Sequence, residues 1–148
     1  MVSENIWNAV IDMLNECDFP TDSGLLNGAQ TVFQYYSELE SGGHESLFSS
    51  LSTYIEENGI ETYLKEITEM LEQIGAHDYA VIGSDYCAEI WQLYVALEND
   101  EIEESEFYTI IEKADDAYNQ LDDKLEQLLT TYFVKIHGEL VGVMEDLK

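Results

Sequence analysis

The sequence contains no arginine, and its five basic residues are all lysines: Lys65, Lys113, Lys124, Lys135 and Lys148. Against them stand 32 acidic residues, so the formal net charge of the 148-residue chain is −27 at pH 7. A protein that binds nucleic acid has to neutralise phosphates with lysine and arginine, and an anionic membrane repels a chain of this sign. The charge therefore argues against direct binding to nucleic acid or to an anionic membrane surface.

The chain is also poor in cysteine and in long apolar stretches. Cys17 and Cys87 lie far apart and belong to no CxxC motif, so we expect two small apolar core residues rather than a redox pair. No apolar stretch approaches the roughly 20 residues of a membrane span. No basic region followed by an apolar stretch marks a signal peptide at the N-terminus. These absences favour a cytoplasmic protein.

Sequence motifs for catalysis, nucleotide binding and metal binding are missing as well. Neither GxxxxGK[ST] nor GxGxxG occurs, and His44, His77 and His137 stand outside any HExxH or Glu-x-x-His motif. No segment has the spacing of acidic residues and glycine that a calcium loop needs. An enzyme also needs electrophilic groups positioned in a cleft, and a chain without arginine has few to offer. We therefore expect no enzyme, no metal and no cofactor.

Apolar side chains, by contrast, are abundant and recur at the helical period. The clearest example is residues 60–74, whose apolar residues share one side of a helix while four glutamates share the opposite side. Gly75 then stands where a left-handed C-terminal cap belongs. The same period predicts helices over residues 6–14, 25–36, 47–55, 78–97, 107–118 and 121–140.

Three positions are expected to begin or interrupt these helices. Ser3 is a candidate N-cap of the first helix. Gly42 and Gly43 separate the second helix from the third, since paired glycines cost too much backbone entropy inside a helix. A kink or break is expected at Gly83-Ser84. The sequence thus predicts an all-α fold, a compact single-domain bundle over residues 1–148 with roughly six to eight helices and a long C-terminal helix.

The acidic residues gather in three groups along the chain. A soluble protein needs a net charge of only about 2–8, and carboxylates three or four positions apart on a helix repel one another. A charge of −27 exceeds that need and indicates a partner that binds surfaces of negative potential. Duplex DNA presents such a surface. The groups are Glu56, Glu57, Glu61, Glu66, Glu69 and Glu72; Asp100, Glu101, Glu103, Glu104 and Glu106; and Asp115, Asp116, Asp122, Asp123 and Glu126.

Three segments within about residues 25–140 carry recognisable patterns. The run Glu40-Ser41-Gly42-Gly43-His44-Glu45-Ser46-Leu47-Phe48 is similar to the motif NGG-(F/H)-x-Q-(F/Y)-F, with Ser41 and Ser46 in place of Asn and Gln. Residues 70–76 are similar to the helix end aLxxIGA, and residues 121–139 to a C-terminal helix of the form lDxxy…l…Yi..h.eef. In this order the segments resemble a bacterial all-helical family, long classed as a domain of unknown function, that includes an acidic DNA-mimic protein.

The resemblance implies both a fold and a function. It implies an all-helical fold with structural motif residues at Gly42, Gly43, His44, Phe48, Gly75 and Ala76. The DNA-mimic member binds DNA-binding proteins, such as a helix-turn-helix repressor and a nucleoid protein, and keeps them off DNA. We therefore expect a protein that uses the three acidic groups to sequester a basic DNA-binding protein.

Two alternatives stay open at this point. The chain could be an immunity-type inhibitor of a basic toxin such as a nuclease, since charge complementarity would speed that encounter too. It could also be a soluble helical domain whose acidity serves only solubility. Whether the chain forms a homodimer is likewise left open by the sequence.

Overall fold

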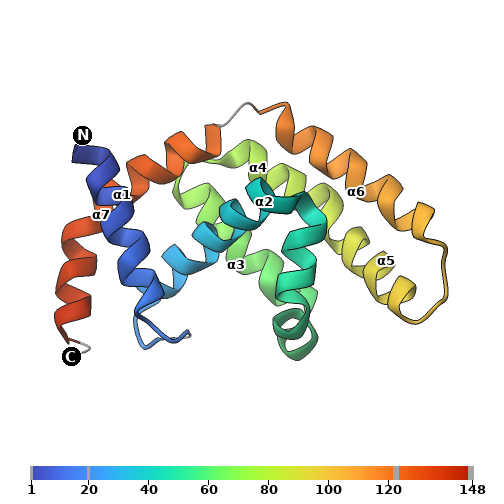
Figure 1. The fold of residues 1–148 in the computed structure, drawn as a ribbon, viewed down its shortest axis with the longest axis horizontal. Coiled ribbons are helices and arrows are strands. Elements are labelled where there is room, and N and C mark those ends of the chain that lie inside the picture. The colour runs from blue at the N-terminus through green and yellow to red at the C-terminus, as the bar shows by residue number, and fades with distance from the viewer. Residues whose placement is uncertain (1, 20, 122–123, 147–148) are drawn as a thin grey trace.

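The structure is a computed structural model that describes residues 2–19, 21–121 and 124–146 (Figure 1). No strand occurs within these ranges, and the last helix is long, so the all-α prediction is confirmed. The α-helical segments are α1 (Val2–Asn15), α2 (Gly24–Asn58), α3 (Ile60–Gln73), α4 (His77–Ile82), α5 (Ala88–Glu98), α6 (Glu104–Asn119) and α7 (Lys124–Asp146).

The helices pack as three neighbouring pairs along the long axis of the molecule. Helix α1 crosses α7 at one end, α2 packs on α3 in the middle, and α5 packs on α6 at the other end (Figure 1). Trp7 of α1 joins the first two pairs, because its ring contacts Phe33 of α2 at 6.0 Å and Phe133 of α7 at 5.3 Å between centroids. The buried apolar residues of all three pairs belong to one core.

Helix α2 bends sharply where the sequence has its paired glycines. Gly42 and Gly43 have non-helical dihedral angles, and the φ of Gly43 is +70°, in the left-handed region. A Cβ atom on Gly43 would lie 2.6 Å from Oδ2 of Asp115 on α6. The expected interruption is therefore confirmed: two helical segments meet at a kink, with no loop between them. We call residues 24–41 and 44–58 the first and second arms of α2.

Side-chain hydrogen bonds connect the two arms and fix the bend. Ser46 and Ser50 of the second arm both donate to Oε2 of Glu38 in the first arm, at 2.7 and 2.6 Å. Close to the bend, Tyr118 of α6 donates to Oε2 of Glu40 at 3.0 Å. Both carboxylates thus hold one element to another instead of standing free.

The cap expected at Gly75 is present. Its φ is +86°, its N–H donates to Glu72 O at 3.1 Å, and the N–H of Ala76 donates to Leu71 O at 2.7 Å. This pair of hydrogen bonds is the Schellman arrangement, which satisfies carbonyl groups at the helix end and requires a left-handed residue. The backbone then turns directly into α4.

Two smaller expectations were wrong, and a third was right only in part. Helix α1 begins at Val2, so Ser3 lies inside it rather than capping it; helix ends are the least predictable positions. The final helix begins at Lys124, and Leu121 lies in the preceding turn. The α-helix is interrupted at Gly83 as expected, but the backbone does not break there. A π-helical turn, Gly83–Cys87, joins α4 to α5, since burial of Ile82 and Cys87 holds the segment helical.

The two cysteines are unpaired, as the sequence predicted. Cys87 is buried in the core, whereas Cys17, expected to be buried too, is only half-buried and donates to Met13 O at 3.4 Å. Nowhere in the described ranges is a helix both long and apolar enough to cross a membrane.

Candidate protein-docking surface

The second acidic group and part of the third lie on α6 and on the turn that precedes it, with Asp100, Glu101 and Glu103 in that turn. Helix α6 runs along the outer edge of the molecule, with the α5–α6 turn at its start (Figure 1). Its inner face is buried, through Phe107, Ile110, Ile111, Ala114 and Tyr118. That packing leaves Glu104, Glu106, Glu112 and Asp116 exposed on the outer side. We call the exposed acidic residues of this edge the α6 ridge: Asp100, Glu101, Glu103, Glu104, Glu106, Glu112 and Asp116.

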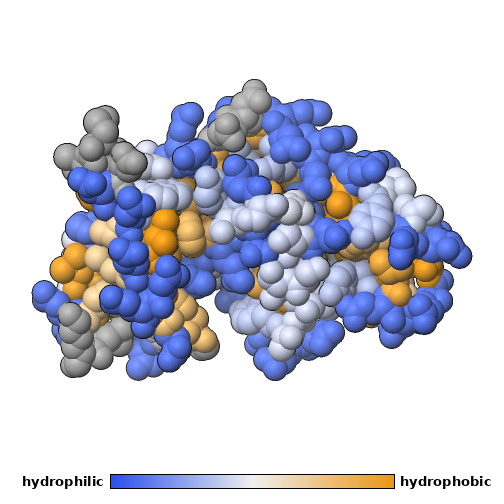
Figure 2. Space-filling view, viewed as in Figure 1, coloured by the Kyte–Doolittle hydropathy of each residue, from blue (hydrophilic) through white to orange (hydrophobic). Residues whose placement is uncertain are grey.

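The α6 ridge includes a residue that the sequence analysis missed. Glu112 is exposed midway along α6 and connects the acidic residues at the two ends of the helix. The helical period of residues 107–118 could have revealed it, because it stands opposite the apolar side. Lys113 is the one basic residue of α6 and is exposed beside it. Figure 2 shows hydrophilic residues predominating along this edge.

The first acidic group forms a separate surface at the end of α2 and along α3. Glu56 and Glu57 are exposed at the end of α2, and Glu61, Glu69 and Glu72 are exposed on the side of α3 opposite its buried residues. Lys65 is exposed on the same side of α3 and reduces its negative potential. Helix α5 contacts both α3 and α6 and lies between them, so this surface and the α6 ridge face different directions.

Glu66 differs from its neighbours on α3. It is half-buried on the flank of the helix, where it accepts a hydrogen bond from the hydroxyl of Tyr54. Burial and this hydrogen bond raise the pKa of Tyr54 to about 12. Glu66 therefore belongs to the packing between α2 and α3 as well as to the acidic surface.

The third acidic group is divided by the fold. Asp115 turns inward from α6 and is bound to His44 at 2.7 Å, so its carboxylate has an internal partner. Asp116 is exposed on the α6 ridge, and Glu126 is exposed in the first turn of α7. Asp122 and Asp123 lie outside the described residues. The residues of this group are close in sequence, but those that the structure describes do not share one surface.

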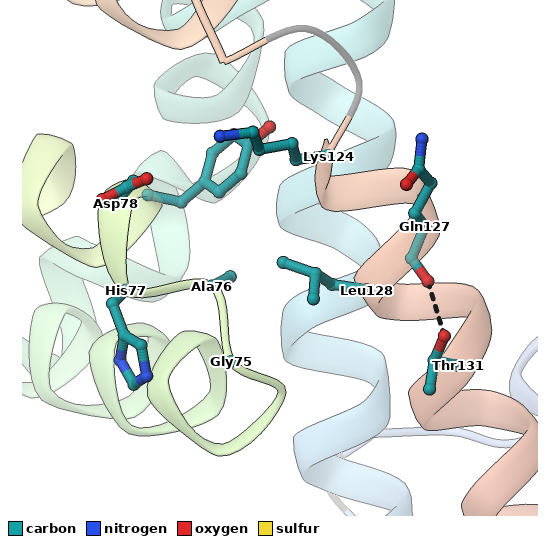
Figure 3. A pocket seen from close by; sticks show the side chains of 9 residues that line it. Gly75, Ala76, His77, Asp78, Lys124, Gln127, Leu128 and Thr131 are labelled. Atoms are coloured by element: carbon teal, nitrogen blue, oxygen red, sulfur yellow. Dashed lines mark hydrogen bonds between the residues drawn. The ribbon is translucent and has the colours of Figure 1, made fainter.

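The motif residues Gly75 and Ala76 line a pocket of about 450 Å³ between the α3–α4 turn and the start of α7 (Figure 3). Lys124 enters it from α7, while His77 points away from Lys124. A lysine at this mouth disfavours a basic partner, so the pocket is a poor candidate for the docking surface.

The described carboxylates do not form a metal site. Within the described ranges, no three histidine, cysteine, aspartate or glutamate side chains are grouped as metal ligands. The acidic residues of α6 and α3 are spread along helix surfaces instead. Such an arrangement favours contact with an extended partner over coordination of a single ion.

Comparison with known proteins identifies a family. Neither a curated protein nor a solved structure matches the chain significantly. Residues 23–137 match the family described as DMP19-like protein. This range contains both arms of α2, the Gly75 cap and the whole α6 ridge, and covers well over half of the chain. The chain is a member of the DMP19-like protein family.

Proposed function

We propose that this protein imitates DNA in the cytoplasm and sequesters a basic DNA-binding protein, with no catalytic activity of its own. The α6 ridge is the observation that carries this proposal. At about 1.5 Å per residue, the 16 residues of α6 extend roughly 24 Å. With one phosphate about every 3.4 Å along each strand, that length corresponds to about seven phosphates.

Rigidity supports the proposal as much as charge does. The ridge stands on a helix whose inner face is anchored in the core by Phe107 and Ile111. The helix backbone that carries Glu104, Glu106, Glu112 and Asp116 is therefore in place before a partner arrives, so binding through them costs little backbone entropy. The family match is consistent with this function, because the resemblance noted in the sequence is to a family with a DNA-mimic member.

Competition with DNA tests the proposal. A labelled DNA duplex is bound to each of a panel of basic DNA-binding proteins at low salt, and this protein is then added. We expect release of the duplex from at least one of them, with an affinity that falls steeply as salt rises. The proposal is wrong if no member of the panel associates with the protein in competition with DNA.

A charge-matched pair of variants locates the surface. Glu104→Gln, Glu106→Gln and Glu112→Gln together remove three charges from the α6 ridge. Asp12→Asn, Glu16→Gln and Glu139→Gln remove three exposed charges from the α1–α7 end. We expect the ridge variant to weaken competition roughly tenfold and the control variant to weaken it less than about twofold.

The same experiment distinguishes the alternative of an immunity-type inhibitor. Such an inhibitor would form a tight one-to-one complex with a basic toxin that persists at high salt. That outcome, found without DNA competition in the panel, would replace the proposal.

A further inference from the structure

A cleft of about 590 Å³ lies between the two arms of α2, at their ends far from the bend. Its walls are the first arm of α2, the second arm of α2 and the start of α3, with Phe19 of the α1–α2 connection at its edge. Figure 2 shows the lower edge of the molecule hollowed between the two arms, whose positions Figure 1 gives. Sites of roughly 300–1,000 Å³ hold small ligands or single side chains.

The polar lining of the cleft accepts hydrogen bonds and carries negative charge. Glu57 of the second arm and Glu66 of α3 contribute two carboxylates. Gln30 and Gln34 add side-chain amide oxygens from the first arm. Among the described residues that line the cleft, none is basic. A cation is therefore the ligand that this lining favours.

The remaining lining is aromatic. Tyr54 is 37% exposed, and its ring packs edge-on against Tyr63 at 6.4 Å between centroids. Tyr63 is 3% exposed, and within the described part of the chain its hydroxyl oxygen has no hydrogen-bond partner. Because that hydroxyl is buried, Tyr63 contributes its ring rather than a hydrogen-bonding group to the wall of the cleft.

We propose that the cleft between the arms of α2 binds an arginine side chain of the basic partner. The guanidinium group is planar, keeps its charge, offers five N–H donors and stacks on aromatic rings. Glu57, Glu66 and Tyr54 provide the matching carboxylates and ring face. The protein has no arginine of its own, so the guanidinium has to come from another molecule. This inference rests on the proposed function, since it names a contact made by that partner.

The experiment uses the full chain and two small probes, N-acetylarginine amide and N-acetyllysine amide. Each carries one positive charge, so general attraction to an acidic protein acts equally on both. Binding is followed by NMR, through shifts of the side-chain amides of Gln30 and Gln34. We expect the arginine probe to bind several-fold more tightly than the lysine probe and to shift these amide signals.

Two charge-matched double variants complete the test. Glu57→Gln with Glu66→Gln removes both carboxylates of the cleft, and the glutamine at 66 keeps an oxygen that can accept from Tyr54. Glu61→Gln with Glu69→Gln removes two exposed charges from the outer side of α3. We expect the cleft variant to weaken arginine binding roughly five- to tenfold and the outer variant to change it less than about twofold. Circular dichroism verifies that both variants stay folded.

The inference is overturned if both probes bind equally, or if the two variants weaken arginine binding to the same extent. Either result leaves the proposed function intact, because DNA competition through the α6 ridge does not require this cleft. Conversely, the protein could fail to compete with DNA while its cleft still binds the arginine probe more tightly than the lysine probe. That result would contradict the proposed function but not arginine binding by the cleft.

Discussion

The ring of His44 and the carboxylate of Asp115 meet across the interface between α2 and α6. Oδ1 of Asp115 lies 2.7 Å from Nδ1 of His44 and also accepts the backbone N–H of His44, at 2.9 Å. A carboxylate can only accept, so Nδ1 carries a proton toward it. His44 is fully buried, and both of its donors depend on this one oxygen. The contact ties α6 to the bend of α2.

Removing that oxygen tests how much the contact contributes to stability. We expect Asp115→Ala to lower the free energy of unfolding by about 1–3 kcal/mol, because two buried donors of His44 lose their acceptor. Asp115→Asn keeps one acceptor oxygen and should lose less. Urea unfolding measures both. The control Asp116→Ala changes the exposed neighbour and should stay within about 0.5 kcal/mol of the unmodified protein. Equal effects at the two positions would contradict this role of Asp115.

A side chain at Gly43 should destabilise the protein for a related reason. Gly43→Ala places a Cβ atom at a φ of +70° and 2.6 Å from Asp115, so we expect a loss of at least about 1–2 kcal/mol. Gly138→Ala is the matched control, because Gly138 lies in α7 and its added Cβ would meet no atom within 4 Å. That change should stabilise the protein by about 0.5–1 kcal/mol through helix propensity. Thermal unfolding of the two variants should therefore shift in opposite directions.

The helical period was sufficient to predict most of the fold. The apolar repeat of residues 60–74 and the glycine that ends it gave α3 and its cap, because both depend only on local geometry. At Gly83 the sequence predicted the position of an irregularity but not its form, because tertiary burial of Cys87 overrides the local tendency of glycine to break a helix and a π-helical turn results. Local patterns do not report such long-range packing.

The candidate site was less predictable than the fold. The acidic groups were found by counting charges along the chain. Such a count does not distinguish a carboxylate that is bound inside the fold from one that is exposed on the surface. Asp115 illustrates the problem, since its partner His44 is 71 positions away in sequence. The cleft between the arms of α2 could not be predicted either, because its walls meet only through the bend at Gly43.

Asp100 is a site where glycine should stabilise the protein. It has a φ of +59° at the end of α5, where its N–H donates to Leu97 O at 3.1 Å and the next N–H, of Glu101, donates to Ala96 O at 2.8 Å. This is the arrangement that Gly75 makes after α3. Asp100→Gly removes the strain and a negative charge from a helix C-terminus, so we expect a gain of about 1 kcal/mol.

Two further variants at Asp100 separate strain from charge. Asp100→Asn removes the charge but keeps a side chain that tolerates a positive φ, and Asp100→Ala removes the charge and keeps the strain. We expect stability to fall in the order Gly, Asn, Ala, as measured by urea unfolding. If alanine proves as stabilising as glycine, charge alone determines the effect.

Salt should stabilise this protein. With a net charge of −27 and most described carboxylates exposed, the folded state is destabilised by its own repulsion, which salt screens. We expect the melting temperature to rise between low and moderate concentrations of sodium chloride. The ridge variant described above, with three charges fewer, should start higher and rise less. A melting temperature independent of salt in both proteins would contradict significant repulsion.

Alkaline pH should unfold the protein through its buried tyrosines and cysteine. Burial raises the pKa of Cys87 to about 12 and the pKa values of Tyr35 and Tyr63 well above their usual range. These groups therefore stay protonated in the folded state while the unfolded state loses their protons from about pH 9 upward. Fewer protons bound in the unfolded state means that stability falls as pH rises, here from about pH 9 through pH 12.

Absorbance of tyrosinate and circular dichroism should accordingly change together for the buried tyrosines, and earlier absorbance changes should come from exposed rings. Tyr63→Phe removes one buried hydroxyl that has no partner in the described structure, so it should shift alkaline unfolding to higher pH. Tyr108→Phe, at a ring that is 41% exposed, should leave the transition nearly unchanged. Ionisation of every tyrosine without loss of helicity would contradict this prediction, because Tyr35 and Tyr63 would then ionise in the folded protein despite their burial.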